Sequence, residues 1–200
     1  MLTFDPILHE YRIDGRFIPS VTYILKSVNM TTNYAAVDPL VLQRAAERGT
    51  AVHKAIEYLN GPGLDWGSLH PDLIPYVQAY QKFTANHVFD YLYGEKILYS
   101  EQWDYAGTPD LIGYIDGVLT LLDIKCTYEL DEPGVEVQLA GYEQLWNENR
   151  YNHAQVNQIA ALHLRRDGTF YLHVCNDGEA WPLFTYALMI TQWRLKHKRC

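Results

Sequence analysis

The sequence has few cysteines and no long uninterrupted apolar run. Its three cysteines, Cys126, Cys175 and Cys200, are odd in number and far apart, so neither a disulfide framework nor a zinc-knuckle spacing is formed. We expect two packed thiols and one at the terminus. No apolar run reaches the length of about 18 residues that a membrane-spanning helix needs. The N-terminus carries acids where a secretory signal has basic and apolar regions, so we expect a cytoplasmic protein without a membrane partner.

Basic residues are also scarce. The formal net charge is −8, from 16 Lys and Arg against 24 Asp and Glu, which argues against a protein that coats nucleic acid non-specifically. A nucleic-acid enzyme remains open, because a few local cations and bound metal ions can hold a phosphate backbone. The basic residues occur in clusters that suit a solvated surface and a ligand contact equally well: Arg44 and Arg48, Arg165 and Arg166, and Arg194, Lys196, Lys198 and Arg199.

The composition is that of a folded domain, with 48% hydrophobic and 20% charged residues among 200. Repeats, low-complexity segments and Ser- or Pro-rich linkers are lacking. We therefore expect a single domain over residues 1–200, in which an N-terminal hairpin (about 9–19) and helical segments (about 38–88) precede the core. Asp38 is a candidate N-cap and Gly61 a candidate C-cap, whereas Gly49 interrupts this helix or marks a close backbone approach.

From about residue 91 the hydrophobic pattern has a period of two. It predicts three successive strands at 95–104, 105–115 and 118–126. A helix at 135–149, a hairpin turned at Asp167-Gly168 and a final amphipathic helix follow. This order predicts an α/β fold with a mixed central sheet flanked by helices on both faces.

The segment GTPDLIGYIDGVLTLLDIKCT, residues 107–127, reads as a buried hairpin with Asp116-Gly117 at a two-residue turn. Counting outward from the turn places Asp110 opposite Asp123, with Lys125 one step further on the same face. Like charges at such a pair, about 5 Å apart, repel each other. A divalent cation such as Mg²⁺ or Mn²⁺ would remove the repulsion by binding both carboxylates. The alternative is an Asp123–Lys125 salt bridge at the hairpin end, with Asp110 in a loop.

Two further pairs of side chains lie four residues apart in helical segments. His53 and Glu57 share one helix face, and a neutral imidazole would complete the coordination of a metal ion. A satisfied histidine without a metal is the ordinary alternative. Gln138 and Tyr142 form the second pair, for which simple packing is the alternative.

Four short motifs follow one another along the chain. They are Gly49 to His53 to Glu57, Gly107-Thr108-Pro109-Asp110, Asp123-Ile124-Lys125, and Gln138 to Tyr142. In this order they resemble the PD-(D/E)XK nuclease superfamily, and the Q-x-x-x-Y element is similar to its RecB-type branch, which includes phage exonucleases and mitochondrial genome maintenance exonucleases. The N-terminal HEYRIDGRFIPSVT is similar to the start of phage-type members, so the resemblance spans about residues 9–175.

The resemblance implies a restriction-endonuclease-like core and a role for each matching residue. It implies that Asp110, Asp123 and Lys125 are catalytic, with Lys125 assisting the attacking water. It implies that His53, Asp110, Asp123 and the backbone carbonyl of Ile124 bind Mg²⁺ or Mn²⁺. Gln138 and Tyr142 would contact DNA or brace the site. Glu57 and Glu101 are candidate outer acids, Glu101 on the preceding strand. On position alone, candidate phosphate contacts are Arg44, Arg48, Ser20 and Thr22.

The function implied is a Mg²⁺-dependent deoxyribonuclease, an exonuclease in DNA recombination, repair or phage DNA processing. DNA is the implied partner, together with a recombination or replication protein. Some relatives carry a four-cysteine iron–sulfur cluster with one early cysteine, but this chain has none before Cys126, so we expect no iron–sulfur cluster. Two alternatives are a catalytically silent nuclease-fold module for DNA binding or assembly, and a metal-stabilised domain without a nucleic-acid role.

Overall fold

A computed structural model describes residues 1–6, 8–32, 36–61, 63–149 and 154–197. Lys198, Arg199 and Cys200, three residues singled out in the sequence, lie outside the described residues. Within the described part, no helix is both long and apolar enough to cross a membrane.

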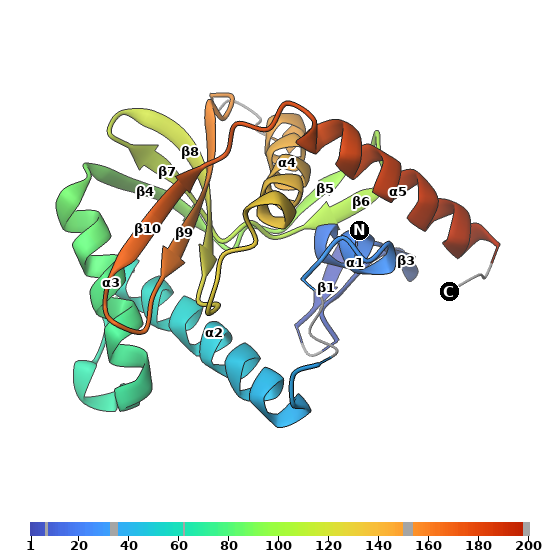
Figure 1. Cartoon of the computed structure of the whole chain (residues 1–200). Helices are drawn as coiled ribbons and strands as arrows, with labels where there is room; N and C mark the ends of the chain where they lie inside the picture. Colours follow the sequence, from blue (N-terminus) through green and yellow to red (C-terminus); the bar gives the residue numbers. More distant parts are fainter. Residues whose placement is uncertain (7, 33–35, 62, 150–153, 198–200) are drawn as a thin grey trace.

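The centre of the fold is a five-stranded sheet in the order β10-β9-β8-β7-β4 (Figure 1). Its strands are β4 (Phe89–Gly94), β7 (Leu111–Ile115), β8 (Val118–Lys125), β9 (Gln158–Leu164) and β10 (Phe170–Val174). β8 and β9 run parallel, and every other neighbouring pair runs antiparallel. The predicted mixed sheet is therefore confirmed.

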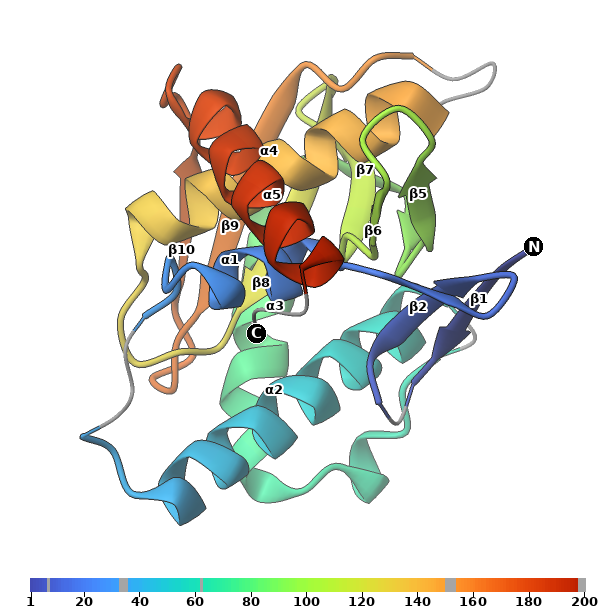
Figure 2. The ribbon, with the colours of Figure 1, turned by 90° about the vertical axis from the view of Figure 1, so that its right-hand side faces the viewer.

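Helices cover both faces of this sheet (Figure 1). One face packs against α2 (Pro39–Asn60) and α3 (Ile74–Asn86), and the other against α1 (Val21–Ser27), α4 (Glu132–Asn149) and α5 (Ala180–Lys196). Figure 2 shows α5 crossing over α4. The two helices approach closely because Gly141 of α4 has no Cβ, which would lie 2.7 Å from the Phe184 ring of α5.

The long helix α2 begins and ends where its sequence signals lie. Asp38 caps it by accepting from the Leu40 amide at 2.7 Å, and Gly61 is the C-cap residue. Gly49 does not interrupt the helix, and a Cβ at this position would meet nothing within 4 Å. Both alternatives weighed for Gly49 are therefore wrong, since the helix is continuous and no backbone atom of another described segment lies within 4 Å of that Cβ position.

Two smaller sheets flank the core. β1 (Leu2–Asp5), β2 (Glu10–Ile13) and β3 (Arg16–Ile18) form one, and β5 (Leu98–Ser100) pairs with β6 (Tyr105–Gly107) in the other. Two short 3₁₀ turns, Trp66–Ser68 and Pro71–Leu73, precede α3.

Two of the three predicted strands are wrong in extent. The segment 95–104 is extended only at β5 and then turns, with Asp104 at a positive φ of 52°. The segment 105–115 breaks between β6 and β7 at residues 108–110, because Pro109 has no amide hydrogen for a ladder. The third strand, β8, matches its predicted range to within one residue.

Candidate functional site at the end of the central hairpin

The hairpin β7–β8 has the register expected from a two-residue turn. Ile115 pairs with Val118 and Leu111 with Leu122, while Asp116 and Gly117 adopt the positive φ values, 51° and 84°, that a type I′ turn requires. Counted outward from the turn, the ladder ends at the Leu111–Leu122 pair, so Asp110 is the first residue beyond it.

Asp110 has left the strand but still contacts its neighbour. Its Oδ2 accepts a 2.7 Å hydrogen bond from the Ile124 amide, and its carbonyl accepts one of 3.0 Å from the Glu95 amide. The direct pair of Asp110 and Asp123 expected from the sequence does not form. Asp110 lies in the loop before β7 and binds the β8 backbone, while Asp123 forms an ion pair with Lys125, which is the alternative arrangement. Both acids nevertheless lie at the same end of β8.

His53 reaches this end of the sheet from α2. Its Nδ1 lies 3.4 Å from Asp110 Oδ1, and its Nε2 lies 3.1 Å from the carbonyl oxygen of Ile124. Residues from α2, from the loop before β7 and from the β8 backbone therefore converge on one point, although up to 71 positions separate His53 from Ile124 in the chain.

Lys125 connects Asp123 of β8 to helix α4. Its Nζ lies 2.6 Å from Asp123 Oδ2 and donates a 2.9 Å hydrogen bond to Gln138 Oε1, and the amide of Gln138 donates in turn to Tyr142 Oη at 3.4 Å. Asp123 is only 3% exposed. The four-residue spacing of Gln138 and Tyr142 places both on the α4 face that meets Lys125.

Burial and neighbouring charges shift the pKa values of Asp110 and Asp123 in opposite directions. Burial raises the pKa of Asp123, Asp110 raises it further, and Lys125 only partly offsets both. Burial alone would also raise the pKa of Asp110, but His53, Lys125 and the Ile124 amide lower it below its usual value. Against the effect of burial, Asp110, Asp123 and the Ile124 carbonyl raise the pKa of His53 to about 9.

The donor set suits a hard divalent cation. Asp123 Oδ2 is buried 2.6 Å from Lys125 Nζ, and within the described part of the chain no other group forms a hydrogen bond with it. His53 Nε2 and the Ile124 carbonyl oxygen, now 3.1 Å apart in a hydrogen bond, are a nitrogen and an oxygen that a divalent cation can bind beside the carboxylates. The side chains of His53, Asp110 and Asp123 do not converge as tightly as a preformed cage, since Asp123 is turned to Lys125.

A groove of about 180 Å³ opens beside Lys125 and Gln138. Thr22 and Lys26 of α1 and Thr127 contribute to its walls. On the other side of the acids, a small hollow is lined by His53, Glu57 and Asp110. The candidate site thus borders a groove at Lys125 and only a very small hollow at His53.

The remaining predicted residues lie at different distances from this centre. Glu57 lines the small hollow and forms an ion pair with Lys54. Arg44 and Arg48 lie on α2, where Arg44 is exposed and the Arg48 guanidinium stacks 5.6 Å from the centre of the Tyr76 ring.

Two predicted contacts fit the structure poorly. Glu101 is not on a strand but on the exposed turn between β5 and β6, so its predicted position is wrong. Ser20 is buried, and its hydroxyl caps α1 by accepting from the Tyr23 amide at 3.0 Å. Its oxygen is therefore engaged in the fold, whereas Thr22 faces the groove.

Two side chains near the site were missed by sequence reasoning. β4 changes register between Tyr91 and Tyr93, and after this bulge Glu95 comes to line the hollow that contains Asp110. Tyr11 of the N-terminal sheet contacts Thr108 Oγ1 through its hydroxyl at 2.6 Å. A lone glutamate after a tyrosine-rich strand, and a tyrosine 97 positions before its partner, give no local signal.

Comparison of the sequence with models of known protein families gives no match. Comparison with curated proteins gives no match either. Among solved structures, the fold is similar to a protein from Eubacterium rectale described as a "Putative exonuclease", with a TM-score of 0.48 and 12% identity over 78% of this chain and 68% of that one. It is also similar to an alkaline exonuclease from Laribacter hongkongensis, with a TM-score of 0.42 and 11% identity over 90% of this chain and 91% of that one.

Proposed function

We propose that the chain is a metal-dependent DNA nuclease with a restriction-endonuclease-like core, of the RecB-like branch of the PD-(D/E)XK superfamily. The observation that carries this proposal is the ion pair of buried Asp123 with partly exposed Lys125, beside Asp110 at the open end of the β7–β8 hairpin. Buried acids with opposed pKa shifts next to a lysine are typical of catalytic sites. The whole described chain would serve as one nuclease domain.

In the proposed reaction, each residue has a distinct task. A bound Mg²⁺ or Mn²⁺ would supply charge neutralisation and an activated water for attack on a DNA phosphodiester. Asp110, Asp123, His53 and the Ile124 carbonyl would hold the ion. Lys125 would orient the attacking water and stabilise developing negative charge near the phosphate. Gln138 Oε1 accepts a hydrogen bond from Lys125 Nζ, which would hold the ammonium beside Asp123 at the wall of the groove.

DNA would enter by the groove beside Lys125. Thr22 and Lys26 line it, and a threonine hydroxyl and an ammonium are suitable donors to phosphate oxygens. Arg44 and Arg48 of α2 would contact the backbone on the other side of the acids. We further propose that the enzyme is an exonuclease of the cytoplasm that acts in recombination, repair or phage DNA processing with a recombination or replication protein.

The test compares cleavage of linear and circular DNA in Mg²⁺ or Mn²⁺ by the wild type and by Asp123→Ala and Lys125→Ala. We expect metal-dependent cleavage of linear DNA only, and a loss of on the order of 100-fold or more in each variant. Asp72→Ala, an exposed acid outside the site, is the matched control and should cleave as the wild type does.

The outcomes separate the proposal from its alternatives. DNA binding without cleavage in either metal would leave a catalytically silent DNA-binding module. Absence of both activities would leave a domain without a nucleic-acid role. Cleavage of circular DNA would retain the nuclease but refute the exonuclease.

A further inference from the structure

A second cluster of metal-binding side chains lies on the same face of the sheet as Asp123. It consists of Glu136 on α4, His173 on β10 and Cys175 just after β10, and one ligand atom from each lies within 4.8 Å of the others. Asp123 is level with Ala161 of β9, which is in turn paired with His173. Two strand spacings therefore separate the cluster from the proposed catalytic site, a distance of about 10 Å.

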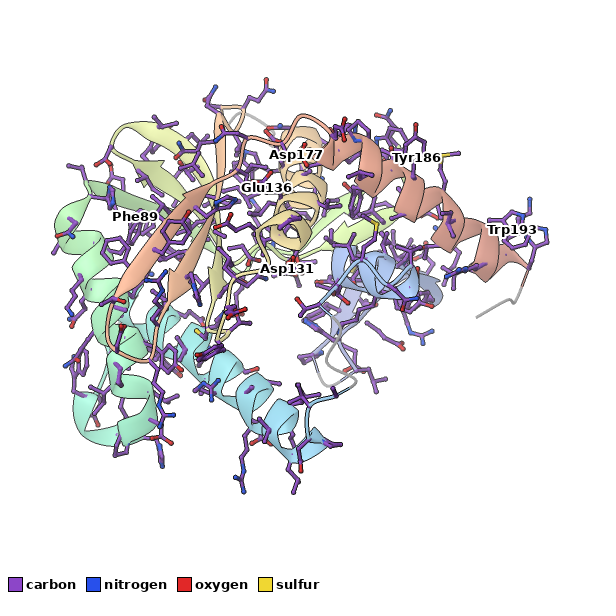
Figure 3. The ribbon with its side chains drawn as sticks, viewed as in Figure 1. Phe89, Asp131, Glu136, Asp177, Tyr186 and Trp193 are labelled. Atoms are coloured by element: carbon purple, nitrogen blue, oxygen red, sulfur yellow. The ribbon has the colours of Figure 1, made fainter. Side chains whose placement is uncertain are left out.

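The three side chains are held in place by neighbouring groups. Glu136 Oε1 lies 2.7 Å from His173 Nε2, and Glu136 Oε2 accepts a 2.9 Å hydrogen bond from the Asp177 amide. Figure 3 shows Glu136 and Asp177 next to each other where α4 faces the end of the sheet. On the far side of the imidazole, His173 Nδ1 lies 3.7 Å from Glu132 Oε1. Metal-binding histidines commonly have such a carboxylate behind them, which fixes the ring.

Burial and charge around the cluster favour a cation. Glu136 is 9% exposed, and within the described part of the chain no lysine or arginine forms an ion pair with it. A hollow of about 310 Å³ beside it is lined by two further acids, Glu143 and Asp177. A buried carboxylate among other carboxylates is costly without a neutralising partner. His173 already contacts Glu136, and a ligand atom of Cys175 lies within 4.8 Å of both.

We propose that Glu136, His173 and Cys175 form a binding site for a zinc-like divalent transition metal. Thiolate, imidazole and carboxylate together are ligands that select Zn²⁺ over Mg²⁺, which prefers oxygen alone. Cys175 and Glu136 both line the hollow, so a fourth position for water or a small ligand faces open space. Cys175 is then a metal ligand and not the simple packed thiol expected from the sequence.

Such an ion would bridge the edge strand β10 and helix α4, because its ligands come from both. Among the described strands β10 pairs only with β9, so a bond to α4 would limit its fraying. Gln138, which holds Lys125, lies two residues after Glu136 on the same helix. The zinc site would thus stabilise the helix that positions Lys125 without taking part in the reaction, and it stands independently of the proposed nuclease function.

The direct test titrates the chelator-treated full-length protein with Co²⁺ and records the sulfur-to-cobalt charge-transfer absorption, followed by displacement with Zn²⁺. We expect a band that saturates at one equivalent and is lost in Cys175→Ser. Glu136→Gln and His173→Asn should weaken Co²⁺ binding at least about tenfold. Cys200→Ser and His70→Asn are the matched controls for thiol and imidazole, and both should bind as the wild type does.

Asp123→Asn separates this site from the proposed catalytic site. It should lose cleavage and keep the thiolate band, whereas Cys175→Ser should lose the band whether or not DNA is cleaved. Zn²⁺ should also raise the melting temperature of the wild type and not that of His173→Asn. Far-ultraviolet circular dichroism tests whether each variant is folded. If Cys175→Ser does not fold, the loss of Co²⁺ binding is measured in Glu136→Gln instead. Absence of a thiolate band in the wild type, or a band that persists in Cys175→Ser, would overturn the proposal.

Discussion

Asp123 and Asp110 show how two neighbouring carboxyl groups acquire different properties. Asp123 is buried among apolar strands, so its charged form depends on Lys125, whereas Asp110 receives a backbone amide and the imidazole of His53. Lys125 lowers the pKa of both acids, so the difference between them comes from the deeper burial of Asp123 and from the imidazole and amide that only Asp110 contacts. This asymmetry is what a site needs if one acid must bind metal tightly while the other adjusts during a reaction.

The pKa of His53 gives a prediction about pH. It is raised to about 9 in the folded chain, against about 6.5 for an unfolded histidine. The stabilisation it contributes is therefore complete below about pH 6.5 and is lost as the pH rises through about 9. Urea unfolding of the chelator-treated protein should show this loss between about pH 6 and about pH 10.

Other groups also titrate in that range, so the control compares the pH dependence of the free energy of unfolding between variants. His53→Gln should have a flatter dependence than the wild type, and exposed His70→Asn should follow the wild type. An unchanged slope in His53→Gln would contradict the raised pKa.

At the residue scale, local spacing predicted the candidate site where partners lie on one element or one hairpin. Asp110, Asp123 and Lys125 are ordered by a two-residue turn, and Gln138 and Tyr142 by helical periodicity. The convergence of these residues with His53 was a hypothesis that the resemblance strengthened, because spacing says nothing about how α2 packs against β8. Glu95 was not predictable, since a bulge in β4 brings it to the hollow.

At the scale of elements, one glycine decides how β6 meets α4. A Cβ on Gly107 would lie 2.7 Å from Tyr142 Cε1 and 3.0 Å from Leu145 Cδ1. Gly107→Ala should therefore displace Tyr142 and, through it, Gln138. We expect a destabilisation of about 1–3 kcal/mol in urea unfolding and a loss of DNA cleavage on the order of 100-fold, because a shift of about 1 Å has such effects on catalysis.

At Gly49, where a Cβ has room, we expect a substitution by alanine to raise the stability of the protein. Gly49 lies inside α2, and a Cβ there would meet nothing within 4 Å. Gly49→Ala should stabilise the protein by about 0.5–1 kcal/mol in urea unfolding, because alanine restricts the unfolded chain and favours helix. It also serves as the matched control for Gly107→Ala. A destabilised Gly49→Ala would show that α2 packs differently at this position.

The elements themselves were predictable to different degrees. Strong cap and turn signals placed α2 and both hairpins of the central sheet, because Asp38, Asp116-Gly117 and Asp167-Gly168 act locally. Periodicity failed at 95–104, where alternation continues through a turn that Asp104 makes with its positive φ. The pairing of β5 with β6 in a separate sheet depends on tertiary packing and has no signature in the sequence.

At the scale of the whole molecule, metal binding should couple to stability. The proposed nuclease site takes ligands from α2, from the loop before β7 and from β8, so an ion bound there stabilises only the folded chain. At a Mg²⁺ concentration of about 100 times its Kd, we expect a stabilisation of about 2.7 kcal/mol, removed by chelator. Thermal unfolding with and without Mg²⁺ measures it.

A double substitution provides the comparison. Asp110→Asn with Asp123→Asn should abolish the Mg²⁺-dependent shift, whereas Asp72→Asn should leave it intact. Equal stabilisation of the double variant would place the Mg²⁺ elsewhere.

The parallel pairing of β8 with β9 has a consequence for the protein during its synthesis. Asp123 and Lys125 leave the ribosome before α4 and β9. The second neighbour of β8 in the sheet is β9, so β8 lacks one of its two neighbours until β9 has been synthesised. Domains generally fold as units, and central strands of a sheet hold their positions only when both neighbours are present. A nascent chain would therefore carry Asp110, Asp123 and Lys125 without an assembled candidate site until β9, which ends at Leu164, has emerged, so the timing of translation would delay the proposed activity.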